Sequence, residues 1–178
     1  MARLIALLRG INVGGRRRVA MADLRDLLTG LGYGDVRTLL QSGNIVLASE
    51  ASPAQLEREL EKQIAATLGV DTQVIVRTRD EIAAVIEHNP LADVADDPKR
   101  YQVSFLSAEP HREVVRELAT VDVAPELVAI RGREIYAWHP EGIQRSPLAK
   151  LISDRRLGVT ATARNWNTVT KLLAMADE

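Results

Sequence analysis

A run of three arginines, Arg16 to Arg18, follows the Gly14-Gly15 pair near the start of this 178-residue chain. Glycines let backbone N–H groups approach an oxyanion, and guanidinium groups hold oxyanions with paired hydrogen bonds. The pattern predicts that a helix begins just after the run, and its N-terminus would add partial positive charge. The spacing fits neither a P-loop nor a dinucleotide fingerprint. We interpret Gly10 to Arg18 as a candidate anion site; the alternative is an exposed loop with solvated arginines.

A second polar stretch runs from Gln41 to Asn44 and contains Ser42. It offers one hydroxyl and two amides between two predicted strands. A serine nucleophile needs a base and an orienting group, and Gly-x-Ser-x-Gly is absent. A tight turn is therefore the simpler interpretation, although Ser42 and Asn44 stay candidates for ligand contact.

A third stretch, Arg164-Asn165-Trp166-Asn167, places one of only two tryptophans among polar residues. A functional interpretation is that Trp166 stacks on a base or ring while Arg164 pairs with a phosphate. The structural interpretation is that Trp166 anchors the last helix to the core and Asn165 caps it. We favour the structural interpretation and keep these residues as candidates.

Several kinds of chemistry are disfavoured by composition. The chain has no cysteine, which excludes disulfides, thiolate metal sites and cysteine nucleophiles. Its histidines show no metal-ligand spacing, and its acidic cluster lacks the glycine and distal glutamate of a calcium loop. We therefore expect no metal and no cofactor. These residues are His88, His111 and His139, and Asp93, Asp96 and Asp97.

The formal net charge is only -1, so the protein as a whole does not attract nucleic acid or an anionic membrane electrostatically. The distribution of charge is uneven, because Met1 to Ala20 holds arginines and no acid. No secretory signal and no apolar run of about 18 residues is present, so we expect a cytoplasmic protein that does not enter a membrane.

Hydrophobic periodicity in the first half predicts strand, helix, strand, strand, helix, strand. This order is the ferredoxin-like, or α/β-plait, unit βαββαβ, whose first and third strands lie centrally. Ser52, Pro53 and Gln55 form a helix start with a capping box. The expected elements are Arg3–Arg9, Met21–Leu31, Val36–Leu40, Asn44–Ala48, a helix from Ser52 to about Leu68, and Gln73–Arg77.

The second half predicts an incomplete or modified copy of the same α/β layout. Strand, helix, strand, strand and helix follow a linking helix at 78–88 and an acidic loop at 91–100. We therefore expect two subdomains, 1–77 and 78–178. The expected elements are Tyr101–Leu106, Pro110–Ala119, Leu127–Ile130, Glu134–Trp138, a helix from Ser146 to about Leu157, and a last helix from Asn165 to Ala176.

Three segments carry a family resemblance: Leu7 to Gly15, Gln41 to Asn44, and Thr162 to Val169. Together they resemble the signatures of a bacterial domain-of-unknown-function family, DUF1697. The resemblance implies two α/β-plait subdomains and no established reaction, cofactor or catalytic residue. The chain departs from the family pattern in its arginine run, and Gln144 and Pro147 stand where relatives often have a glycine and a lysine.

Three function hypotheses follow. The first is a binding protein for a phosphorylated small molecule or a polyanion such as nucleic acid; the central strands lack the aromatics of RNA-binding versions of this fold. The second is an enzyme on a small anionic substrate, with Ser42, Asn44 or His139 nearby. The third is a self-associating scaffold, such as a homodimer, because the first sheet is apolar on both faces. The candidate ligand-binding residues are Arg9, Asn12, Gly14, Gly15, Arg16, Arg17, Arg18, Ser42, Asn44, Arg164, Asn165 and Trp166.

Overall fold

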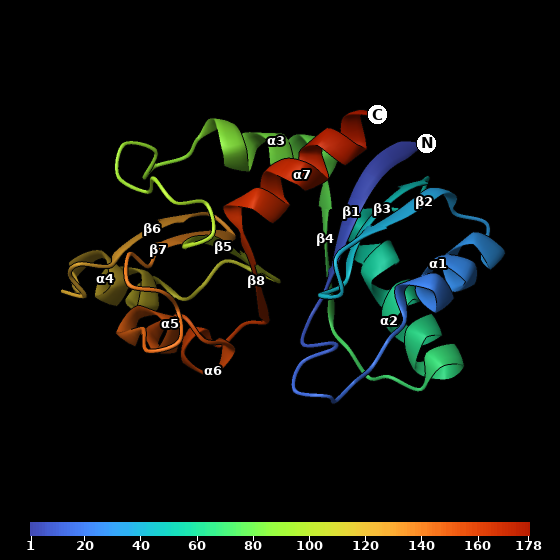
Figure 1. The fold of residues 1–178 in the computed structure, drawn as a ribbon, viewed down its shortest axis with the longest axis horizontal. Coiled ribbons are helices and arrows are strands. Elements are labelled where there is room, and N and C mark those ends of the chain that lie inside the picture. The colour runs from blue at the N-terminus through green and yellow to red at the C-terminus, as the bar shows by residue number, and fades with distance from the viewer. The chain divides into compact units, whose positions relative to one another are not determined.

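The computed structural model describes residues 1–178 and divides into two compact units (Figure 1). The first unit contains Met1–Ala84 and Lys171–Glu178, and the second contains Val85–Thr170. The boundaries fall inside the helices α3 (Arg79–Glu87) and α7 (Trp166–Asp177). Compact packing alone does not define a folding domain, so the domain ranges 1–77 and 78–178 stay a prediction. No helix combines the length and apolarity needed to cross a membrane.

The first unit confirms the predicted ferredoxin-like order. Its sheet is antiparallel, with strand order β2-β3-β1-β4, so β1 and β3 lie centrally as expected. Ser52 and Gln55 form the predicted capping box on α2, and Gly69 ends that helix in the left-handed conformation. The elements are β1 Ala2–Leu8, α1 Met21–Gly30, β2 Gly34–Leu39, β3 Asn44–Ser49, α2 Pro53–Leu68 and β4 Val74–Thr78.

Strand β1 is buried on both faces, as its doubly apolar sequence predicts. Leu4, Ala6 and Leu8 lie in the core that α1 and α2 form on one side of the sheet. Ile5 and Leu7 point to the other side and are 0% exposed. The strand is therefore held from both directions, and its end at Leu8 is fixed within the core.

The second unit repeats the layout in full. Its sheet has the order β6-β7-β5-β8, and β8 (Ala161–Asn165) pairs antiparallel with β5. The sequence did not predict this strand, and its presence makes the copy a modified one and not an incomplete one. The other elements are β5 Tyr101–Leu106, α4 Arg112–Thr120, β6 Leu127–Arg131, β7 Glu134–Trp138, α5 Pro147–Leu151 and α6 Asp154–Leu157.

The copy is nevertheless modified, because the single helix expected from Ser146 to Leu157 is two short helices. Ser153 has an extended backbone, with φ -71° and ψ 155°, and becomes the N-cap of α6. One extended residue breaks the helical hydrogen-bond ladder, so the segment forms two helices, α5 and α6, and not one. The helix layer of the second sheet is therefore less continuous than that of the first.

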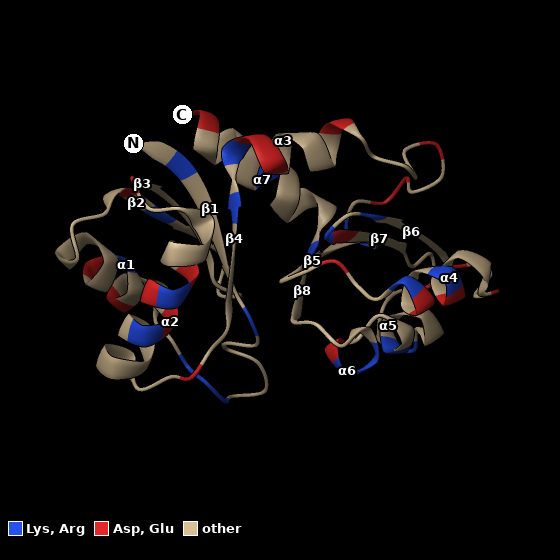
Figure 2. Ribbon diagram, turned by 180° about the vertical axis from the view of Figure 1, so that it is seen from behind, with Lys and Arg blue, Asp and Glu red and all other residues tan.

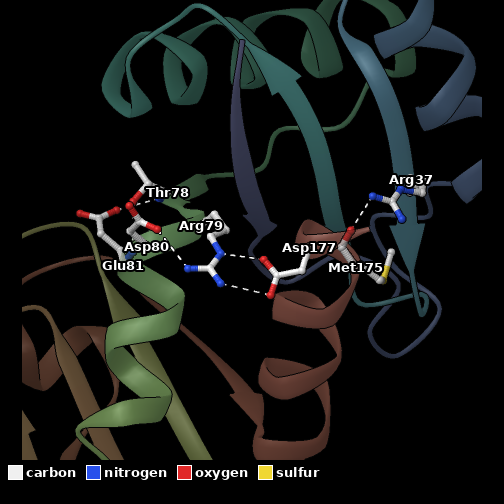
Figure 3. A network of polar contacts seen from close by, with 7 residues as sticks. All are labelled: Arg37, Thr78, Arg79, Asp80, Glu81, Met175 and Asp177. Carbon is white, nitrogen blue, oxygen red and sulfur yellow. Dashed lines mark hydrogen bonds and ion pairs between the residues drawn. The ribbon is translucent and has the colours of Figure 1, made fainter.

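Within the first unit, polar contacts join the end of α7 to the rest of that unit (Figure 3). Arg79 donates two hydrogen bonds to the Asp177 carboxylate, from Nε to Oδ1 at 2.7 Å and from Nη2 to Oδ2 at 3.1 Å. Arg37 on β2 donates to the carbonyl oxygen of Met175. Arg37 pairs with Val46, and Val46 pairs with Ile5, so these three side chains share one face of the sheet. The end of α7 therefore lies on the face that α1 and α2 leave uncovered.

We expect this attachment to depend on the ionisation of Asp177. The hydrogen bonds from Arg79 hold the pKa of the Asp177 carboxyl below its ordinary value. A lowered pKa stabilises the folded state above the unfolded value of about 3.9, and the stabilisation is lost as the pH falls through the lowered value. Asp177→Asn should therefore increase amide hydrogen exchange in the last turn of α7 at neutral pH.

Asp80→Asn is the matched control, because Asp80 contacts Arg79 through one hydrogen bond only, at 3.1 Å. It should change exchange in that turn much less. Equal exchange in the two variants would show that the paired contact does not hold the helix end.

Candidate functional site

The loop between β1 and α1 contains a tight hairpin turn. Val13 and Arg16 form an isolated antiparallel bridge, and the amide of Arg16 donates to the carbonyl of Val13 at 3.1 Å. The two residues between them, Gly14 and Gly15, have φ of 60° and 74°. Positive φ at both central positions is the type I′ turn, which favours a glycine pair. The glycines are therefore required by the turn itself.

Asn12 fixes the base of this loop through its side chain. Its Oδ1 accepts from the Val19 amide at 2.8 Å, and its Nδ2 donates to the Val19 carbonyl at 2.9 Å. The same Nδ2 donates to the carbonyl of Gln41 at 2.6 Å, in the turn between β2 and β3. One side chain thus joins the start of the loop, its end and a neighbouring turn. Asn12, which was predicted as a ligand-binding residue, therefore positions the loop.

An open pocket of about 430 Å³ lies beside this junction. It is lined by Asn12, Gly15, Arg18, Val19, Ala20 and Gln41. Ala20 is the N-cap of α1 and provides no side-chain hydrogen bond, so no side chain caps the first amides of the helix. Arg18 and the residue that precedes the first amides of α1 therefore both line this pocket.

The three arginines of the loop are exposed, and Figure 2 shows basic segments along the loop between β1 and α1. Their guanidinium groups make no ion pair and no hydrogen bond within the protein. Nη2 of Arg18 lies 3.6 Å from the position that a Cβ on Gly15 would occupy. Arg18 therefore folds back over the glycine turn, beside the pocket, while Arg16 and Arg17 extend the basic surface.

Backbone strain is concentrated around this pocket. Four non-glycine residues have positive φ, and three of them, Asn12, Arg17 and Leu40, lie in the loop or next to Gln41. Asparagine tolerates this conformation, but it costs about 1 kcal/mol or more for arginine and leucine. Strain of this kind often accompanies a binding site, where the surrounding structure holds the backbone in place.

The turn from Gln41 to Asn44 supports the loop from below. Asn44 is 0% exposed, and its Nδ2 donates to the Leu39 carbonyl at 2.8 Å and to Ser42 Oγ at 2.9 Å. The Gly43 carbonyl accepts from the amide of Leu8 at the end of β1. Asn44 therefore organises the turn, while Ser42 is exposed at its surface.

Arg164, Asn165 and Trp166 belong to the second unit and have structural contacts there. Arg164 is 7% exposed and donates to Thr162 Oγ1 and to the Ala163 carbonyl; burial lowers its pKa to about 10. Asn165 Oδ1 accepts from the Thr168 amide and so caps α7. Trp166 stacks on Tyr101 with ring centroids 4.9 Å apart. The interpretation of this segment as an anchor and cap is the one that these contacts support.

Three residues that line the pocket were not predicted as site residues: Val19, Ala20 and Gln41. Val19 and Ala20 have apolar side chains that do not indicate a binding site in a sequence. They line the pocket because they lie directly before α1. Gln41 was named only as part of a turn. Arg9, which was predicted, is held by its backbone: its amide donates to Gln73 and its carbonyl accepts from Thr72 Oγ1 at 2.8 Å.

Comparison with known proteins places this fold in a family. The model of the family described as "Protein of unknown function (DUF1697)" matches residues 1–136. The chain is also similar to a solved structure, that of the conserved bacterial protein SP0830 from Streptococcus pneumoniae. The two share 28% identity over 98% of each chain, with a TM-score of 0.79. The comparison with curated proteins gave no match.

The close packing under the loop gives a stability prediction. A Cβ on Gly43, whose φ is 84°, would lie 2.8 Å from both Leu8 Cβ and Ile11 Cδ1. We expect Gly43→Ala to lower the free energy of unfolding by about 2–4 kcal/mol, because overpacking adds to the left-handed strain. Denaturant unfolding measures this change.

Gly69→Ala is the matched control, since Gly69 also has positive φ, 67°, but nothing lies within 4 Å of its added Cβ. This substitution should lower the free energy of unfolding by about 1–2 kcal/mol, the strain of an alanine in the left-handed conformation. Similar losses in the two variants would show that the space beneath the loop is not tight.

Proposed function

The chain belongs to the DUF1697 family, and we propose that it binds a small phosphorylated or otherwise anionic molecule in the pocket beside the Gly10–Arg18 loop. The observation that carries the proposal is the meeting of two anion-attracting features at one pocket. These are the N-terminus of α1, which no side chain caps, and the unpaired guanidinium of Arg18.

The local charge supports this ligand class. Arg16, Arg17 and Arg18 have no acidic partner, whereas the first turn of α1 contains a single acid, Asp23. A bound phosphate would therefore face more positive than negative charge. Because the arginines are exposed to solvent, their attraction is screened over about 8–10 Å at physiological ionic strength. The helix amides at the pocket supply the short-range hydrogen bonds that fix an oxyanion in one place.

The size of the pocket favours a small molecule over a nucleic acid strand. A volume of about 430 Å³ lies within the range of about 300–1,000 Å³ that is usual for small-molecule sites. The strands β1 and β3 carry no aromatic side chain on which bases could stack. Arg16 and Arg17 would then attract the ligand at longer range, and Arg18 would contact it.

Asn12 has a positioning role in this proposal. Both polar atoms of its side chain are engaged with the Val19 and Gln41 backbone, so it holds the pocket open instead of contacting the ligand. The amides of Gly15 and of the first turn of α1 are the expected hydrogen-bond donors. No reaction is assigned to the site.

We expect Arg18→Ala to weaken binding of pyrophosphate about tenfold or more, because a charge-assisted hydrogen bond contributes about 1.5–3 kcal/mol. The measurement is isothermal titration calorimetry with pyrophosphate. Wild-type protein should also be stabilised against heat by about 2.7 kcal/mol at a pyrophosphate concentration 100 times the dissociation constant.

Arg58→Ala is the matched control, since Arg58 is an exposed arginine without an ion pair on α2. It removes the same charge outside the pocket. An equal loss in both variants would mean that only net charge matters. Binding of a short DNA strand with a steep salt dependence, without pyrophosphate binding, would favour the polyanion alternative.

A further inference from the structure

The second unit contains a buried polar cluster apart from the anion pocket. His139 Nδ1 lies 2.5 Å from Glu126 Oε2, and Ser146 Oγ contacts both side chains. The second carboxylate oxygen, Oε1, accepts from the Leu148 amide at 3.1 Å. All three side chains are at most 7% exposed.

The Glu126 carboxylate determines how the imidazole is used. Desolvation by burial raises the pKa of the Glu126 carboxyl. Hydrogen bonds from Ser146, His139 and the Leu148 amide outweigh that effect and hold this pKa below its ordinary value. An ionised Glu126 accepts a hydrogen bond from Nδ1–H, so in the neutral ring the lone pair is on Nε2. Nε2 is buried and has no hydrogen-bond partner. Ser146 touches the Nδ1 side, so this arrangement is not a serine nucleophile with its base.

His139 lines a pocket of about 130 Å³ between the sheet and the broken helix layer. Gln102 and Ser104 of β5 contribute polar side chains, and neither makes a hydrogen bond within the protein. Ser104 is only 5% exposed, so its hydroxyl is enclosed with the pocket. Ala163 of β8 lies opposite Ser104 in the sheet register. One buried atom without a partner, His139 Nε2, and the polar side chains of Gln102 and Ser104 therefore belong to residues that line one small space.

The first unit shows what this position looks like without a pocket. There, the strands β1 and β4 present Leu4, Ala6, Val74 and Val76 to one continuous helix, α2, and all four residues lie in the apolar core. In the second unit the corresponding strands β5 and β8 present Gln102, Ser104, Ala161 and Ala163 beneath two short helices. Smaller and more polar residues, with a break in the helix, turn a packed core into a lined cavity.

We propose that this pocket is a second ligand site, which takes a small molecule with hydroxyl or amine hydrogen-bond donors and uses His139 Nε2 as an acceptor. No lysine or arginine lines the pocket, whereas Asp154 does, so an anion would lack a counter-charge. The site therefore selects a ligand class opposite to that of the loop in the first unit. Without a ligand, burial of His139 Nε2 costs free energy, because this atom loses its hydrogen bond to water and gains no partner.

The test is a nuclear magnetic resonance titration of the full chain with glycerol, ethanolamine and acetate as probes. Long-range ¹H–¹⁵N spectra report the His139 ring nitrogens, and amide spectra report Gln102 and Ser104. We expect glycerol or ethanolamine to shift these signals saturably, and acetate to leave them unchanged. We also expect the neutral ring to carry its proton on Nδ1. A ring protonated on Nε2 alone, or no saturable shift with either donor-bearing probe, would overturn the proposal.

Two variants locate the binding. Ala163→Val adds bulk at an exposed pocket residue and should weaken probe binding about tenfold, whereas Ala119→Val, at an exposed alanine of α4, should leave it unchanged. His139→Asn keeps a donor for Glu126 and removes Nε2, so it should abolish the shift at Ser104. Unchanged binding in Ala163→Val would contradict the proposal even if His139→Asn fails to fold.

Discussion

The double burial of strand β1 is the constraint on which the first unit depends. Leu4, Ala6 and Leu8 are buried on one side of the sheet, and Ile5 and Leu7 are buried on the other. A shift of register would expose these side chains, so the register of β1 is fixed. Its end is fixed further by the hydrogen bond from the Leu8 amide to Gly43. The chain must leave the sheet there and return to start α1. The Asn12 contacts hold that loop in one shape, and the pocket proposed to bind an anion lies beside it.

Most of the fold could be predicted because its signals are local. The apolar strands, the Ser52 capping box and the glycine stops each appear within a few residues. Strand β8 was missed because Ala161 to Asn165 has small and polar residues with no large apolar alternation; its stability comes from pairing with β5. The break before α6 was missed because Ser153 was not recognised as a cap. The attachment of α7 to β2 rests on Arg37, more than 100 residues away in sequence, and no local pattern shows it.

The sites were predictable to different degrees. The arginine run and glycine pair marked the loop as a candidate, because both signals lie within a few consecutive residues. The partners that shape the pocket, Val19, Ala20 and Gln41, have no such signal. Glu126, His139 and Ser146 are separated in sequence and meet only through folding, so their cluster could not be read from spacing. The two halves share one plan, yet the first packs its core solidly where the second leaves a polar pocket.

The most direct test of the proposed anion site is a map of amide chemical shifts during a pyrophosphate titration of the wild-type protein. If the proposed site is right, saturable shifts will concentrate at Gly15, at Arg18 and in the first turn of α1, from Met21 to Asp23, because Gly15, Arg18 and the residue before that turn line the pocket. Shifts that are absent there, or that gather instead around the arginines and lysines of the last 40 or so residues, would contradict the assignment of the pocket.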